Sequence, residues 1–169
     1  MAELPSMWRT ELWHPLSVHF PVALLTGAGL LALALPLLSR TRAGSGLRFS
    51  YSLLLWAGLV GFWIAYYTGR LAYTIEVRRI CDPGVLKEHL LWSYICGAIF
   101  SAAAAFDLVR VFLRGRLRLG ARTVGLLLTI GGAVCMAYLG HLGAKLVYQQ
   151  AAGVHVPSED CAEFSDPAP

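Results

Sequence analysis

The sequence has little charge, and what charge it has lies between long uncharged stretches. Of its 169 residues, 57% are hydrophobic and only 14% are charged, whereas a soluble domain carries roughly 25% charged residues. The uncharged stretches also lack the polar face that a helix of a soluble bundle turns to water. These absences exclude an ordinary soluble domain, and the length of the chain indicates one small domain.

Several motifs that carry chemistry are also missing. The sequence has no Cys-x-x-Cys-His for covalent haem attachment, no cysteine pair with structural-zinc spacing, and no P-loop or Ser/His/Asp arrangement. No nucleic-acid motif occurs, so we attribute the net charge of +4 to membrane topology. The N-terminus lacks the basic segment and short apolar core of a cleavable signal peptide. Hydrolytic, nucleotide and nucleic-acid functions therefore have no support.

Four long apolar stretches are present instead. Each has at least the roughly 20 residues that cross a hydrocarbon core of about 30 Å, and helix is the expected form because lipid offers backbone groups no partner. The expected spans are about 16–38, 51–72, 89–109 and 123–148. We therefore expect an all-α membrane protein, a four-helix up-down-up-down transmembrane bundle over 16–150. A periplasmic or interfacial segment, 1–15, precedes it, and a periplasmic tail, 151–169, follows.

Basic residues indicate how the bundle is oriented. The loops after the first and third spans contain eight Lys or Arg residues and one acid, Asp107, whereas the opposite side has six Lys or Arg residues and nine acids. Lys and Arg near span ends favour the cytoplasmic side. We therefore expect both termini on the outer face, in the periplasm if the chain lies in a bacterial inner membrane. We also expect Asp107 to pair with Arg110 at the end of the third span.

The cysteines fit this orientation. Cys81 in the second loop and Cys161 in the tail would both lie outside, where disulfides persist. A Cys81–Cys161 bond is expected, and two free thiols are the alternative. Cys96 and Cys135 fall inside spans and are interpreted as small apolar residues.

Histidines gather toward the same outer face. Using the helical rise, His19, His89 and His141 lie about 9, 6 and 10 Å inside the first, third and fourth spans, with His14 just above them. Intramembrane ionisable groups usually face the bundle interior or a cavity, and neutral imidazole binds haem iron, copper and zinc. Small residues nearby, such as Gly143, either make room for a porphyrin or allow close helix packing. Both interpretations stay open.

The segment His14-Pro-Leu-Ser-Val-His19-Phe-Pro21 resembles the opening of an uncharacterised family of bacterial four-helix membrane proteins. Members end their last span with Gly-Gly-x-Leu-Val-Tyr and a Gly-x-Gly-Val run. This chain has Gly143-Ala-Lys-Leu-Val-Tyr148 and then Ala151-Ala-Gly153-Val154, with alanine in place of two glycines. The resemblance covers nearly the whole chain.

A second resemblance carries a functional implication. Gly140-His-Leu-Gly143 is similar to a Gly-His-x-Gly-Gly motif of membrane domains attached to c-type cytochromes, and others in this broad group are fused to Rieske iron–sulfur domains. His89 matches a histidine that opens the third span in many of them. The resemblance implies a redox role with haem b.

We therefore predict a b-type haem-binding electron-transfer subunit of a larger respiratory or photosynthetic complex, acting at the outer face. The expected ligands are His19 and His89, with His141 as a replacement or a propionate contact and His14 as a fourth candidate. One haem is favoured over two, because two porphyrin rings at the same depth would be crowded in a small bundle. His155, in the tail, is expected to have no part.

The expected surroundings of the haem follow from its depth. Arg70, Arg79 and Lys145 are the candidate partners of its propionates. Because the cytoplasmic half has no histidine, the expected redox partners are a periplasmic cytochrome c, a Rieske protein or quinol, besides membrane lipid and other subunits. Two alternatives remain open: a non-redox structural or anchor subunit, and a copper- or zinc-handling membrane protein.

Overall fold

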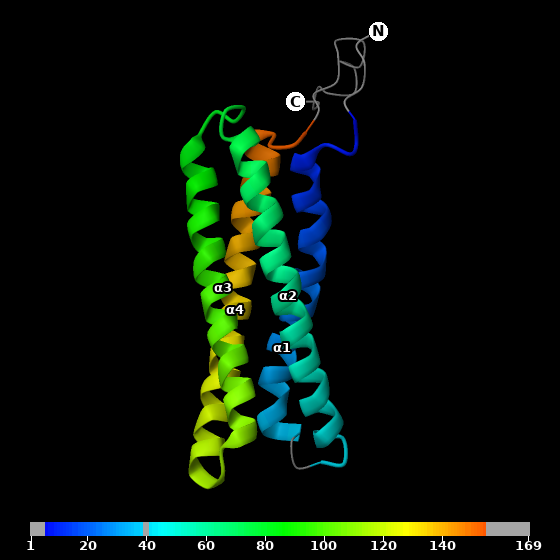
Figure 1. The fold of residues 1–169 in the computed structure, drawn as a ribbon, viewed down its shortest axis with the longest axis vertical. Coiled ribbons are helices and arrows are strands. Elements are labelled where there is room, and N and C mark those ends of the chain that lie inside the picture. The colour runs from blue at the N-terminus through cyan, green and yellow to red at the C-terminus, as the bar shows by residue number, and fades with distance from the viewer. Residues whose placement is uncertain (1–5, 39–40, 155–169) are drawn as a thin grey trace, which may run out of the picture.

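The protein is a bundle of four long helices that run alternately up and down (Figure 1). The computed structural model describes residues 6–38 and 41–154. A 3₁₀ turn, Thr10–Leu12, leads into α1 (Trp13–Leu38), and α2 (Gly44–Glu76), α3 (Pro83–Phe112) and α4 (Gly115–Gln150) follow. All four helices are long and apolar enough to cross a membrane. The predicted fold class is confirmed.

The helices extend beyond the uncharged stretches that predicted them, because local capping rather than hydropathy decides where a helix ends. α3 begins where the Asp82 carboxylate accepts a hydrogen bond of 2.8 Å from the Gly84 amide, with Pro83 in the first helical position. α4 ends at Gln150, because the next residue, Ala151, adopts a left-handed conformation with φ of 52°.

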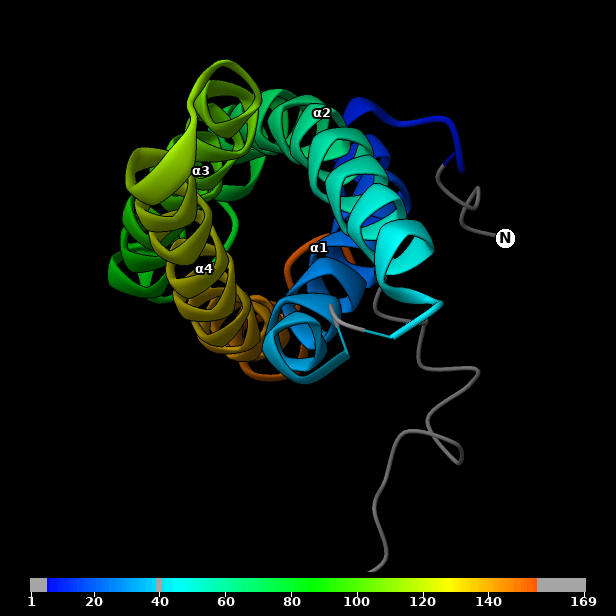
Figure 2. The ribbon, with the colours of Figure 1, turned by 90° about the horizontal axis from the view of Figure 1, so that it is seen from below.

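The helices form a ring in chain order. α1 packs along α2 and α3 along α4, with smaller contacts between α1 and α4 and between α2 and α3, so α1 and α3 face each other across the diagonal (Figure 2). Glycines allow close approach: a Cβ on Gly132 would lie 2.8 Å from the Phe100 ring. Leu25 and Leu55 join Phe100 in the buried core, while large apolar side chains such as Leu30 are exposed on the outer surface, where lipid would cover them.

The two ends of the bundle differ in their polar residues. The histidine end comprises the first turns of α1 and α3 and the last turns of α2 and α4, and the arginine end is opposite. At the arginine end, Asp107 is buried and its Oδ1 lies 2.7 Å from Arg110 Nε, which confirms the predicted pair. Ser52 Oγ and Trp56 Nε1 also donate to this carboxylate, at 3.2 and 3.3 Å.

Candidate functional site

Two histidines meet in the interior of the histidine end. His14 is in the first turn of α1 and His89 is near the start of α3, so they approach each other across the bundle diagonal. Their ring centres are 6.3 Å apart and the ring planes are nearly perpendicular, at 79°. Both side chains are half-buried. The packing therefore brings together two imidazoles that are 75 positions apart in the sequence, from 14 to 89.

A backbone carbonyl fixes the orientation of His14. Its Nδ1 lies 2.9 Å from the carbonyl oxygen of Ala65 on α2. A carbonyl oxygen only accepts hydrogen bonds, so Nδ1 carries the proton and Nε2 of the neutral ring keeps its lone pair. Thr68 Oγ1 donates to the same carbonyl at 2.9 Å. This is the arrangement in which metal-binding histidines are commonly held, with one nitrogen anchored and the other left to bind.

His89 has a buried nitrogen without a partner. Its Nδ1 is shielded from solvent and makes no hydrogen bond. The Leu139 carbonyl on α4 lies near the ring, but no contact to Nδ1 meets hydrogen-bond geometry. Buried polar atoms are almost always hydrogen-bonded, and leaving one unsatisfied costs about 1–3 kcal/mol. The unsatisfied nitrogen therefore marks a position where a bound group would be stabilised.

Glycines on the other two helices make room for the histidine rings. A Cβ on Gly69 of α2 would lie 2.9 Å from His14 Cε1 and 3.0 Å from its Nδ1. A Cβ on Gly143 of α4 would lie 3.4 Å from His89 Cε1. The two histidines come from α1 and α3 and the two glycines from α2 and α4, so all four helices shape this site.

The remaining candidate histidines lie elsewhere. His19 and His141 are both exposed on the outer surface of the bundle. His19 is five residues after His14, a rotation of about 140° around the helix. His141 is two residues before Gly143 and therefore points about 160° away from it. His155 and Cys161 lie outside the described residues, so the Cys81–Cys161 bond stays a prediction.

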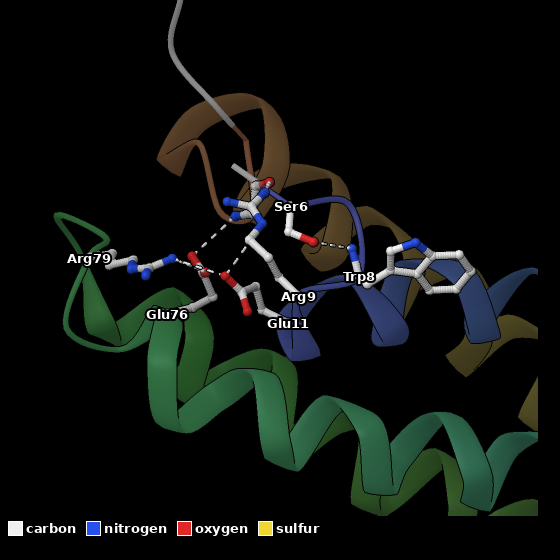
Figure 3. A network of polar contacts seen from close by, with 7 residues as sticks. Ser6, Trp8, Arg9, Glu11, Glu76 and Arg79 are labelled. Carbon is white, nitrogen blue, oxygen red and sulfur yellow. Dashed lines mark hydrogen bonds and ion pairs between the residues drawn. The ribbon is translucent and has the colours of Figure 1, made fainter. Parts of the chain in front are cut away.

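The predicted propionate partners are also spread out. Arg70 is exposed and Lys145 is half-buried. Arg79 belongs to a charge cluster that joins the lead-in to α1, the end of α2 and the segment after α4 (Figure 3). Its guanidinium lies 3.2 Å from the buried Glu11 carboxylate and 3.5 Å from that of Glu76. Protein carboxylates therefore already engage Arg79.

The same cluster contains residues that were not among the predicted site residues. Arg9 lies 3.7 Å from Glu11 and donates to the Gly153 carbonyl at 3.4 Å. The Gly153 amide in turn donates to Glu76 Oε2 at 3.1 Å. These contacts tie together segments from both ends of the described chain at the histidine end of the bundle.

The two cysteines inside the spans are neighbours in the core. Cys96 on α3 and Cys135 on α4 are both buried, and their thiols are close enough to interact. The Cys96 thiol also lies 3.8 Å from the Gly132 carbonyl oxygen. Within residues 6–38 and 41–154, no three His, Cys, Asp or Glu side chains come together as a metal-ion site would require.

Comparison with protein families gives one match, to a model described as predicted membrane protein DUF2231, over residues 12–156. The chain belongs to this family. Neither the curated proteins nor the solved structures gave a match. The matched region of this DUF2231 chain contains all four helices, His14, His89 and the glycines that flank them. Membership confirms the resemblance to an uncharacterised membrane family, while the relation to cytochrome- and Rieske-linked domains stays a prediction.

Proposed function

We propose that this chain is a membrane subunit that binds one haem b between His14 and His89 and transfers electrons at the histidine end. The observation that carries the proposal is the histidine pair itself. One imidazole is anchored so that Nε2 is left to bind, and the other has a buried nitrogen without a partner. The structure changes the preferred pair, because the sequence favoured His19 with His89 and His19 is exposed.

The spacing of the pair fits a haem iron held on both sides. A metal-bound imidazole nitrogen lies about 2.0–2.1 Å from the metal, so two imidazoles on opposite sides of one metal have ring centres about 6 Å apart. The observed separation is 6.3 Å. Porphyrin supplies the other four nitrogens of haem iron, so two histidines complete its coordination. A zinc ion held by protein needs three or four ligands, which favours haem over the zinc- or copper-handling alternative.

The chain's own residues would hold and tune the group. The haem would supply reversible one-electron chemistry. The Ala65 carbonyl keeps His14 in one tautomer and raises its basicity as a ligand. Because Gly69 and Gly143 have no side chain, no methyl group presses against the His14 and His89 rings. His89 is six positions after Pro83, the first residue of α3, which puts the site about 9 Å from that helix end and within reach of a partner there.

The location and partners follow from charge and depth. We propose that the histidine end faces the periplasm of a bacterial inner membrane, with both termini outside, as the arginine-rich opposite loops favour. The redox partner would then be a periplasmic cytochrome c, a Rieske protein or quinol, within a larger complex. Cys81, which is exposed, would form its disulfide with Cys161 in the same compartment.

The test is the colour of the purified protein. The full chain, produced with a supply of haem and extracted in mild detergent, is compared before and after reduction by absorption spectroscopy. We expect a Soret band, a sharp α-band on reduction and one haem per chain in a pyridine haemochrome assay. A colourless protein, or one with stoichiometric copper or zinc and no haem, would refute the proposal.

A further inference from the structure

The hydroxyl of Thr68 shares a carbonyl with the ring of His14. Thr68 is on α2 and is buried, with 8% of its surface exposed. Its Oγ1 lies 2.9 Å from the Ala65 carbonyl oxygen, and His14 Nδ1 lies 2.9 Å from the same oxygen. A carbonyl oxygen has two lone pairs, so both donors fit. Each donor withdraws electron density from the oxygen, however, and so weakens the hydrogen bond of the other.

Thr68 has a second acceptor within reach. Ser17 of α1 lies with its Oγ 3.0 Å from Thr68 Oγ1, and the same Oγ lies 3.0 Å from the His14 carbonyl oxygen. Each hydroxyl has one proton, so two protons serve three contacts. Either Thr68 donates to the Ala65 carbonyl, or it donates to Ser17, which then donates to the His14 carbonyl. In the second arrangement, the His14 ring has the Ala65 carbonyl without competition from Thr68.

The strength of the hydrogen bond at Nδ1 bears on how His14 would hold a metal. A stronger bond gives the ring more imidazolate character, which makes Nε2 a stronger electron donor. A stronger donor stabilises ferric over ferrous iron, so it lowers the potential of a bound haem. A Thr68 proton on the Ala65 carbonyl therefore raises the potential, and a Thr68 proton on Ser17 lowers it.

We propose that Thr68 is a positioning residue that sets the ligand strength of His14 by placing its proton either on the Ala65 carbonyl or on Ser17 Oγ. The effect on potential rests on the proposed haem site. The effect on the His14 ring does not, because the hydroxyls and the carbonyl belong to the chain itself. The two effects are therefore measured separately, on protein with and without haem.

The test uses the full-length protein in mild detergent. Thr68→Val removes the hydroxyl at nearly constant volume, and Thr68→Ser keeps it. Thr74→Val is the matched control, because Thr74 makes the same kind of bond within α2, to the Leu71 carbonyl at 2.8 Å, but is exposed. Ser17→Ala removes the alternative acceptor and leaves the Thr68 proton on the Ala65 carbonyl. Circular dichroism checks that each variant is folded.

With haem bound, the midpoint potential is measured by redox titration followed at the α-band. We expect Thr68→Val to shift the reduction equilibrium about threefold toward ferric haem, which is roughly 30 mV at about 59 mV per tenfold change. Ser17→Ala should shift it in the opposite direction, and Thr68→Ser and Thr74→Val should match the wild type. An unchanged potential in Thr68→Val, or an equal fall in Thr74→Val, would overturn the proposal.

Without haem, nuclear magnetic resonance of isotope-labelled histidine follows the His14 Nδ1 proton, which is identified by its loss in His14→Ala. A stronger hydrogen bond moves this proton downfield. We expect a downfield shift in Thr68→Val that Thr68→Ser does not show, and no shift in Thr74→Val. An unshifted proton in Thr68→Val would overturn the proposal. If no variant, wild type included, binds haem, the haem proposal fails, and this shift alone decides whether Thr68 acts on His14.

Discussion

The two ends of this bundle differ in whether the buried polar group between the helices has a partner. At the arginine end, Asp107 accepts hydrogen bonds from a guanidinium, a hydroxyl and an indole, so the buried carboxylate is satisfied within the protein. At the histidine end, His89 Nδ1 is buried and has no partner. Satisfied buried groups stabilise a fold, whereas an unsatisfied one leaves a hydrogen-bonding or ligating position open.

The contacts of Asp107 therefore have a structural role, whereas the histidine pair is where we propose that a ligand binds. At the arginine end, the donors to the buried Asp107 carboxylate come from Arg110, Ser52 and Trp56 of the protein itself. At the histidine end, the open nitrogen lies in the interior, so the haem that we propose would have to enter between the helices. Disrupting the Asp107 contacts should therefore cost stability, and disrupting the histidine pair should cost haem binding.

The largest stability effect is expected at Asp107. Asp107→Ala leaves Arg110, whose side chain is 18% exposed, with the Ser52 hydroxyl but without its carboxylate, and breaking a buried ion pair costs about 3–5 kcal/mol. Asp107→Asn, which keeps an oxygen for the Ser52 and Trp56 donors, should lose less. Thermal unfolding followed by circular dichroism measures both. A loss below about 1 kcal/mol for the alanine variant would mean that the pair behaves like an exposed salt bridge.

A smaller effect is expected from filling the space beside His14. Gly69→Ala puts a methyl group 2.9 Å from His14 Cε1. Such overpacking costs about 1–3 kcal/mol, so haem retention should fall about tenfold. Gly140→Ala is the matched control, because nothing lies within 4 Å of its added Cβ. Haem retention in detergent is measured by absorbance after size-exclusion chromatography. Equal retention by both variants would show that the space beside His14 has no role in binding.

The smallest effect is expected from two tyrosine hydroxyls. Tyr51→Phe removes a buried hydrogen bond of 2.8 Å to Thr129, which still donates to the Gly125 carbonyl, so the expected loss is about 1 kcal/mol. Tyr138→Phe removes an exposed bond to Glu88 and should change stability by less than about 0.5 kcal/mol. Parallel thermal unfolding compares the two. A larger loss of stability for Tyr138→Phe than for Tyr51→Phe would contradict the burial of Tyr51 and the exposure of Tyr138.

The sequence predicted the helices and the Asp107–Arg110 pair because both depend on local features, namely apolar length and a three-residue spacing on one helix. It did not predict which histidines meet. Depth was estimated from helical rise, but rotation around the helix decides which side chain faces inward. His14 lies seven residues before the buried Pro21, which is two helical turns, whereas His19 does not share that face. Buried residues such as Leu139, Leu142 and Leu146 likewise define a face of α4 that excludes His141.

Other features of the site depend on tertiary packing and leave no sequence signal. Nothing in the sequence near Ala65 marks its carbonyl as the anchor of His14, because any residue there has a carbonyl. The partners of Arg79 depend on how the lead-in to α1 folds back over α2, which brings Glu11 to it from 68 positions away. Long flexible side chains have many partners within reach, so sequence position alone does not select one.

Haem content in four single histidine variants tests most directly whether His14 and His89 hold the haem. His14→Ala and His89→Ala remove the two rings that meet inside the bundle, while His19→Ala and His141→Ala remove exposed rings of α1 and α4 at the same end of the bundle. All four are purified as full-length folded protein, and haem per chain is measured with the reduced spectrum. We expect the first two variants to lose the haem and the second two to keep it with an unchanged α-band. Full haem in His14→Ala, or its loss in His19→Ala or His141→Ala, would contradict the pairing of His14 with His89.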